Sequence, residues 1–321
     1  MRKGLTRVFA LLLCVLTLVG CAGNNGSLYT KETNMDEITI ENEVVALSAE
    51  YSLPPELPSV EPSGKLTQKC SKAIIDYSNT ADGYVMAQFT AQTKNKIKVQ
   101  VAGPTTTYTY NLEPGEWDAF PLSDGNGTYK VTIYENVSDT KYSAVISASF
   151  TINLEDEFAP FLRPNQYVDY TVAEMTVAKG KELCAQLENP LEKVAAVYDF
   201  VVSNFKYDRL KAIKVKSGYL PVLDEVLKAK KGICFDYAAV MTAMLRSQGV
   251  PCKLVVGYAG TTYHAWISVW SKGEGWIDGA VFFDGETWQR MDPTFASSND
   301  RSDKIMEFIN NNENYTVKYL Y

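Results

Sequence analysis

The sequence predicts an α+β protein in which a small β-sandwich precedes several helices and a mostly antiparallel sheet. Three observations support this class. Residues 66–153 alternate apolar and polar side chains, apolar residues recur at helical spacing after Thr171, and strand-like runs return between residues 253 and 292. A chain of 321 residues is long enough for two such domains.

The first predicted domain covers residues 65–155. Its alternating runs lie at 84–89, 97–101, 129–134 and 144–150, and turn signals such as Asp82-Gly83 and Pro114-Gly115 separate them. Short strands at this spacing are typical of an immunoglobulin-like sandwich. No polar constellation marks this region, so we assign it no chemistry.

The second predicted domain covers residues 160–321. Thr171 and Glu174 have capping-box spacing, which predicts a helix to about Leu187 with Gly180 as a weak point. Asn189-Pro190 predicts the start of a second helix. Two more helices are expected over Leu223–Lys230 and from Cys234 to near Gly249, and four strands over Lys253–Tyr258, Tyr263–Trp270, Gly275–Asp278 and Thr287–Asp292.

The N-terminus has the architecture of an export signal. A basic start precedes the apolar run Val8–Val19, which ends at Leu18-Val19-Gly20-Cys21. This tetrapeptide resembles a bacterial lipobox, which implies removal of residues 1–20 and lipidation of Cys21. The alternative is a plain secretory signal followed by an incidental cysteine. The first interpretation predicts an exported protein anchored by lipid to the bacterial cell membrane, facing the outside of the cytoplasm.

Residues 21–64 are predicted to be a disordered tether, because they are acidic and rich in proline and cannot bury enough apolar surface to fold alone. The chain has a formal charge of −7, and loss of Arg2, Lys3 and Arg7 with the signal changes it to −7−3 = −10. Such a net charge argues against a nucleic-acid partner. It also argues that an anchor, and not electrostatics, holds the protein at a membrane.

Four cysteines remain once Cys14 and Cys21 are set aside: Cys70, Cys184, Cys234 and Cys252. A Cys70–Cys184 disulfide and two free thiols are both compatible with the sequence. The chain has no CxxC pair, HExxH or EF-hand loop and has one histidine. We therefore expect neither a metal site nor a cofactor.

Three residues have the order and chemistry of a nucleophilic site. Cys234 begins a predicted helix, His264 lies in a predicted strand 30 residues later (264−234), and Asp292 ends another strand after a further 28 (292−264). Alternation along its strand is expected to put His264 on the same face as Trp266. A thiolate is favoured at a helix N-terminus, an imidazole can act as base and acid, and a carboxylate can orient the imidazole. Together they predict cysteine-dependent acyl transfer.

Each residue also has an ordinary explanation. Cys234 could begin a core stripe, His264 could be a half-buried ring, and Asp292-Pro293 could open a turn. The order of the three and the absence of a second histidine favour the site. Cys252 is interpreted as structural, since His264 is the only base that the sequence offers.

The motifs around these residues resemble the transglutaminase-like superfamily. They are Gly232-Ile233-Cys234-Phe235-Asp236-Tyr237-Ala238, Leu245 to Pro251, Val256-Gly257-Tyr258, His264-Ala265-Trp266 and Asp292-Pro293-Thr294. The resemblance covers about residues 190–295. It implies a papain-related core with Cys234 as nucleophile, His264 as base and acid, and Asp292 as orienting group.

The chain departs from that resemblance at Cys252-Lys253, where the family usually has a small residue and arginine. Lysine lacks the planar fork of arginine, so a contact that the family makes there is in doubt. The oxyanion donor upstream of Cys234 is also undefined, and Tyr207 is a weak candidate.

The predicted function is hydrolysis or amine transfer at amide bonds of proteins or peptides, with cell-wall peptides as one candidate substrate. The aromatic residues Tyr207, Tyr263, Trp266 and Trp288 are weak candidates for substrate binding. The alternative is a non-catalytic surface module that uses the same fold for binding or as a scaffold. The sequence defines no oligomeric state.

Overall fold

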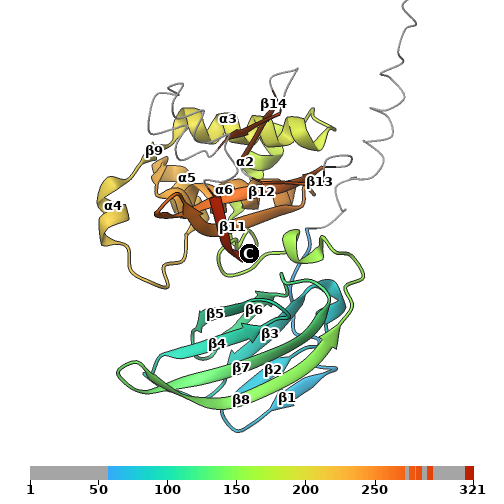
Figure 1. Ribbon diagram of the computed structural model, residues 1–321, viewed down its shortest axis with the longest axis vertical. Coiled ribbons are helices and arrows are strands. Elements are labelled where there is room, and N and C mark those ends of the chain that lie inside the picture. The colour runs from blue at the N-terminus through green and yellow to red at the C-terminus, as the bar shows by residue number, and fades with distance from the viewer. Residues whose placement is uncertain (1–56, 272–274, 279, 284–287, 292–314) are drawn as a thin grey trace, which may run out of the picture. The chain divides into compact units, whose positions relative to one another are not determined.

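A computed structural model describes residues 57–271, 275–278, 280–283, 288–291 and 315–321 (Figure 1). The chain divides into the units Met1–Thr39 and Ile40–Tyr321, and every described residue belongs to the second unit. The predicted signal sequence, Cys21 and most of the predicted tether lie outside these ranges. Within them, no helix is long and apolar enough to cross a bilayer.

The N-terminal half of the described chain forms two four-stranded antiparallel sheets. Their strand orders are β1-β2-β3-β6 and β5-β4-β7-β8. The strands are β1 (Thr67–Lys69), β2 (Ala73–Asp76), β3 (Tyr84–Phe89), β4 (Ile97–Ala102), β5 (Thr107–Leu112), β6 (Trp117–Pro121), β7 (Gly127–Ser138) and β8 (Lys141–Ile152), with short 3₁₀ helices η1 (Thr80–Asp82) and η2 (Ala159–Phe161).

Alternation along these strands determines which side chains are buried. In β4, Ile97, Val99 and Val101 are buried and the residues between them are half-buried. Inward-facing residues of both sheets, such as Val85 and Val131, belong to one hydrophobic cluster. The expected all-β region is confirmed, while its immunoglobulin-like assignment stays a prediction.

In the part of the chain that the structure describes, five α-helices follow: α2 (Glu174–Cys184), α3 (Pro190–Asn204), α4 (Arg209–Lys214), α5 (Leu223–Ala229) and α6 (Cys234–Ser247). The start of α3 is confirmed, because the side chain of Asn189 accepts a 2.9 Å hydrogen bond from Leu191 N–H. The helix α6 begins at Cys234 as expected and ends before Gly249, whose φ is +76°. The helix α4 is not predicted from the sequence.

The predicted cap of α2 is wrong. The hydroxyl of Thr171 donates to the side chain of Asp169, and the helix begins at Glu174 and ends at Cys184, three residues before Leu187. Asp224 of α5 supplies the cap instead, accepting from the N–H groups of Met175 at 3.1 Å and Thr176 at 2.9 Å. A carboxylate from a distant segment thus replaces the local hydroxyl.

Gly180, expected to weaken α2, lies at the contact between α2 and α6. A Cβ atom at this position would lie 3.1 Å from both Cα and the carbonyl oxygen of Met244. The absence of a side chain therefore permits the two helices to approach closely, which offsets the low helix propensity of glycine.

A four-stranded antiparallel sheet of order β13-β12-β11-β16 packs against α6. The strands are β11 (Cys252–Ala259), β12 (Thr262–Ser271), β13 (Gly275–Asp278) and β16 (Tyr315–Leu320), and β14 (Ala280–Phe283) pairs separately with β15 (Trp288–Met291). The sequence did not predict β14 and β16. The two-residue strands β9 (Lys206–Tyr207) and β10 (Lys231–Gly232) pair in parallel.

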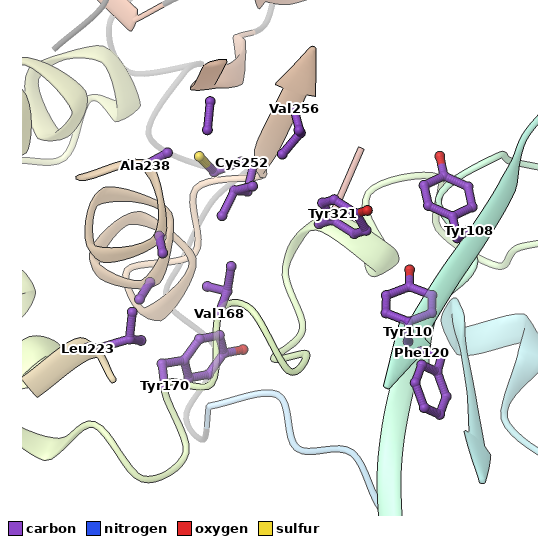
Figure 2. Packing of buried hydrophobic residues seen from close by; sticks show 14 of the residues in the cluster. Tyr108, Tyr110, Phe120, Val168, Tyr170, Leu223, Ala238, Cys252, Val256 and Tyr321 are labelled. Carbon is purple, nitrogen blue, oxygen red and sulfur yellow. The ribbon is translucent and has the colours of Figure 1, made fainter. Parts of the chain in front are cut away.

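The buried helix α6 is the centre of this core. All its residues from Asp236 to Ser247 are buried, and the Sγ atom of Cys252 in β11 lies 3.6 Å from the hydroxyl of Thr242. Figure 2 shows Ala238 of α6 close to Cys252, and Tyr321 beside Tyr108 and Tyr110. The ring centroid of Tyr321 lies 5.7 Å from that of Tyr108 and 5.9 Å from that of Tyr110.

Arg246 of α6 forms hydrogen bonds with three segments that lie far from one another along the chain: β11, the loop before α2 and the C-terminal residue. Its guanidinium is fully buried and donates to the carbonyl oxygens of Cys252 at 2.9 Å, Arg163 at 2.7 Å and Tyr321 at 2.6 Å. Burial lowers the pKa of Arg246 to about 10. These three charge-assisted hydrogen bonds compensate part of the cost of desolvating the cation.

We predict that Arg246→Met lowers the free energy of unfolding by about 3–5 kcal/mol, because it removes three charge-assisted hydrogen bonds, to the backbone oxygens of Cys252, Arg163 and Tyr321. The melting temperature should fall on the order of 10 °C. Chemical and thermal denaturation measure both quantities. Arg209→Met is the matched control, since Arg209 is exposed, and it should change stability by less than about 0.5 kcal/mol. Equal effects of the two substitutions would contradict this role for Arg246.

Candidate active site

The candidate nucleophile, Cys234, is the first residue of α6. Its thiol is free and half-buried, at the end of a helix whose later residues are buried. The first N–H groups of a helix lack partners within the helix, and they stabilise negative charge placed near them. The thiol thus lies at a position that suits an attacking thiolate and the oxyanion that attack produces.

The residues that precede Cys234 pair through their backbone with residues 206–208. Gly232 pairs in parallel with Tyr207, and its carbonyl oxygen accepts a 2.7 Å hydrogen bond from the N–H of Asp208. Tyr207, the weak oxyanion candidate, therefore lies beside the approach to the nucleophile. The backbone pairing fixes where α6 begins.

Asp236 provides a second constraint on the start of α6. Its carboxylate is fully buried and accepts from Ile233 N–H at 2.8 Å and from the Tyr219 hydroxyl at 2.6 Å. The ammonium group of Lys211 lies 2.7 Å from the same carboxylate. A Cβ atom on Gly232 would lie 2.7 Å from this side chain, so the close approach requires glycine.

In the sequence, Asp236 stands out only as part of a motif, and neither Lys211 nor Tyr219 is identified as a site residue. Lys211 also lies 2.7 Å from the hydroxyl of Tyr219, so the three side chains form one network. Burial and the hydrogen bond to Asp236 raise the pKa of the Tyr219 hydroxyl well above its usual range. No periodicity or motif links these residues, which are 25 (236−211) and 17 (236−219) positions away.

His264 lies in β12 opposite Gly257 of β11 and is 5% exposed. Its ring stacks on Trp266 with centroids 6.3 Å apart, which confirms that the two side chains share a face of the strand. The ring of Trp266 is buried and packs edge-on against Tyr315 at 5.2 Å. A Cβ atom on Gly257 would lie 2.9 Å from the Trp266 ring, so this glycine leaves room for the support of His264.

Tyr263 relates the start of β12 to the nucleophile. The pKa of its hydroxyl is raised by partial burial, by Tyr319 and Tyr258, and by Cys234. The phenol therefore lies within electrostatic reach of the thiol, and His264 follows it directly in the chain. Tyr263 is 58% exposed, so its side chain is accessible from solvent.

Two other predicted site residues are less well defined. Asp292 lies outside the described residues, so the structure does not place the third member of the candidate triad. The backbone of Trp288 begins β15, while its side chain lies outside the described part. Trp266 is described and is 1% exposed, and its ring contacts with His264 and Tyr315 lie inside the fold.

Lys253, where the family usually has arginine, packs against aromatic rings. Its ammonium group lies 3.4 Å from the ring centroid of Trp276 and 4.9 Å from that of Phe161. Trp276 and Phe161 also contact each other edge-on at 5.2 Å. The cation–π contacts give this lysine a structural role that does not need a planar fork.

The other described cysteines differ from Cys234 in their surroundings. Cys70 is exposed, Cys184 and Cys252 are buried, and all are free thiols in this structure. Of the two alternatives for Cys70 and Cys184, the structure therefore contains free thiols. Burial raises the pKa of Cys184 and of Cys252 to about 11, which makes both poor nucleophiles near neutral pH.

We predict that Asp236→Ala lowers the free energy of unfolding by about 3 kcal/mol, because it removes the acceptor of a buried N–H and the counterion of Lys211. Asp236→Asn should lose less, since an amide oxygen can still accept from Ile233. Denaturant unfolding measures stability, and the rate of Cys234 alkylation measures the position of the thiol. If Asp236→Ala left both unchanged, the network would not position Cys234.

Comparison with known proteins agrees with the predicted family for one part of the chain. A family model described as the transglutaminase-like superfamily matches residues 178–293. These residues run from α2 through β15 and include Cys234 and His264. The matched part thus covers the helices and strands that carry the candidate site.

Two curated relatives illustrate the range of this similarity. The kyphoscoliosis peptidase of Mus musculus is 27% identical over 153 residues, which cover 42% of this chain and 21% of that protein. A protein-glutamine gamma-glutamyltransferase of Pseudomonas aeruginosa is 26% identical over 98 residues, 26% of this chain and 13% of that protein. The similarity is confined to about a fifth or less of each relative's length.

Among solved structures, red sea bream transglutaminase aligns with a TM-score of 0.29 and 15% identity, covering 71% of this chain and 53% of that one. The residues of the family match include the motifs around Cys234 and His264. The chain contains a transglutaminase-like domain at residues 178–293.

Proposed function

We propose that this protein is a cysteine-dependent enzyme that acts on amide bonds of proteins or peptides. The observation that supports the proposal most is the position of Cys234, a half-buried free thiol at the first residue of a buried helix within a transglutaminase-like domain. The two other buried thiols have pKa values raised to about 11, so the chain offers one thiol at a suitable position in this domain.

In the proposed reaction, the Cys234 sulfur attacks the amide carbonyl and forms a C–S bond while the C–N bond breaks. His264 takes the thiol proton and gives it to the leaving amine, which leaves an acyl-enzyme. The first N–H groups of α6 stabilise the oxyanion of the tetrahedral intermediate. Asp292 is the proposed partner of the other ring nitrogen of His264.

The second half-reaction determines the class of enzyme. Water releases an acid and completes hydrolysis, whereas a lysine amine forms a new amide bond and completes cross-linking. We propose hydrolysis, because no separate feature for recruiting an amine is visible in the sequence. Cell-wall peptides are candidate substrates if residues 1–21 direct export and lipid anchoring as their sequence predicts.

Substitution of Cys234 tests the chemistry directly. We predict that the wild-type protein converts glutamine-containing peptides to hydrolysed or deamidated products and that Cys234→Ala abolishes the conversion. Mass spectrometry with a labelled amine present separates hydrolysis from amine transfer. His264→Gln should reduce the rate at least a hundredfold. Identical product profiles for the wild type and Cys234→Ala would leave a non-catalytic scaffold as the better interpretation.

Thiol reactivity provides a test that needs no substrate. We predict that iodoacetamide alkylates Cys234 faster than the exposed Cys70, because the N–H groups at the helix N-terminus and the proposed base His264 assist attack by the sulfur. Cys184 and Cys252 should stay unmodified until the pH approaches about 11 or the protein unfolds, since their folded-state pKa values are raised to about 11. Peptide-level mass spectrometry measures each cysteine in one sample.

The exposed thiol of Cys70 serves as an internal reference for that measurement. His264→Gln should slow the alkylation of Cys234 without changing that of Cys70. If Cys234 reacts more slowly than Cys70 in the wild type, the proposed activation of the thiol is wrong.

A further inference from the structure

Residues 209–222, which comprise α4 and the loop to α5, form an exposed apolar surface. We call them the α4 segment. The most exposed side chains are Ile213 at 81% and Leu210 at 65%. Of the twelve large apolar residues exposed in the described part of the chain, five belong to these fourteen positions: Leu210, Ile213, Val215, Leu220 and Val222. Such a concentration marks an interaction surface.

Exposed apolar residues also occur at the start of α2. Met175 is exposed, and its N–H donates to Asp224, two residues beyond Val222. Val172, three residues before Met175, is 75% exposed. The hydrogen bond brings the start of α2 close to the C-terminal end of the α4 segment.

The net charge of the chain conceals a local excess of positive charge around the α4 segment. Residues 206–231 contain eight lysines and arginines and three acidic residues, a local charge of 8−3 = +5 in a chain of −7. The three acids all have partners within the fold: Asp208 pairs with Lys231, Glu225 pairs with Lys228, and Asp224 caps α2. Each of these three carboxylates therefore already has an ion-pair or hydrogen-bond partner within the fold.

The cations of the α4 segment are mostly not neutralised. Lys211 pairs with Asp236. Arg209, Lys214 and Lys216 are exposed, and among the described residues no carboxylate forms an ion pair with any of them. Lys214 and Lys216 also line an open hollow of about 380 Å³ formed by residues 211–219. The segment thus presents apolar side chains surrounded by cations.

We propose that the α4 segment docks onto an anionic lipid bilayer. Leu210 and Ile213 insert at the boundary between head groups and acyl chains, while Arg209, Lys214 and Lys216 lie at the level of the lipid phosphates. Two features favour a bilayer over a folded acidic partner. Leu210 and Ile213 are exposed and do not line the hollow beside them, and the long lysine side chains can extend back to the phosphates.

The proposal does not depend on the acyl chemistry, but it has a consequence for the site. Lys211 and Tyr219 of the α4 segment both contact Asp236, two residues beyond Cys234. Docking therefore brings the membrane surface to the element that holds the start of α6. Substrates attached to or lying on the membrane would reach the site in a defined orientation.

Hydrogen exchange of the full chain on vesicles tests the docking surface. We expect vesicles of 30% phosphatidylglycerol in phosphatidylcholine to slow amide exchange in peptides covering residues 206–222 at least threefold, and pure phosphatidylcholine vesicles to have little effect. The readout is local, so attachment through residues 1–21 alone does not reproduce it. Unchanged exchange on the anionic vesicles would overturn the proposal.

Matched variants separate the apolar and the electrostatic contributions. Leu210→Ser with Ile213→Ser, and Lys214→Glu with Lys216→Glu, should each abolish the protection while the melting temperature stays constant, since all four side chains are exposed. Val137→Ser with Lys141→Glu changes an equally exposed apolar residue and a lysine at the β7–β8 hairpin and should retain it.

Three further results would contradict docking to an anionic bilayer. They are equal protection on pure phosphatidylcholine, equal loss in the hairpin control variant, and protection by a soluble poly-glutamate peptide without protection by the anionic vesicles. The last result would identify an acidic protein as the partner.

Discussion

The carboxylate of Asp236 is the constraint on which the candidate site depends. It is fully buried, and a buried charge destabilises the fold unless a counterion and hydrogen-bond donors surround it. Lys211, Tyr219 and the N–H of Ile233 meet this requirement. Because these partners come from α4, the following loop and the chain before Cys234, one carboxylate fixes three segments relative to the first turn of α6. The close approach that results excludes a side chain at Gly232, so the glycine, cysteine and aspartate of the motif follow from one arrangement.

The parts of the fold that the sequence predicts well are those specified by local signals. Asn189 and Pro190, which are adjacent in the sequence, define the start of α3. Alternation of apolar and polar side chains defines the strands β4 and β12. The failures occur where a distant residue supplies the contact. Thr171 has the spacing of a cap, but Asp224, 53 residues later (224−171), caps α2. The residues of β16 are exposed or half-buried, so the strand lacks a buried apolar face that would predict it from the sequence. It forms by pairing with β11, which is distant in the chain.

The candidate site follows the same division. Sequence reasoning placed Cys234 at a helix start and His264 with Trp266 on one strand face, because helix and strand periodicity suffice for both. It did not identify Lys211 and Tyr219, since their role exists only after the chain between α3 and α6 has folded back on Asp236. Lys253 shows the opposite case. Its departure from the family pattern suggested a lost contact. In the structure, its ammonium group instead packs against the rings of Phe161 and Trp276. Such cation–π contacts need a positive charge near the ring but not the planar group of arginine.

The positive charge of residues 206–231 relates the candidate site to the proposed membrane surface. A net charge of −7 suggests repulsion from anionic lipid, but adsorption depends on the charges within about a Debye length of the surface, which is ~8 Å at physiological ionic strength. The local excess of +5 in residues 206–231 can therefore attract an anionic surface although the chain as a whole is acidic. The segment that carries this excess contains Lys211, which neutralises Asp236, and its neighbours Lys214 and Lys216 face solvent. One short basic segment therefore both stabilises the start of the nucleophile helix from inside and determines which surface approaches it from outside.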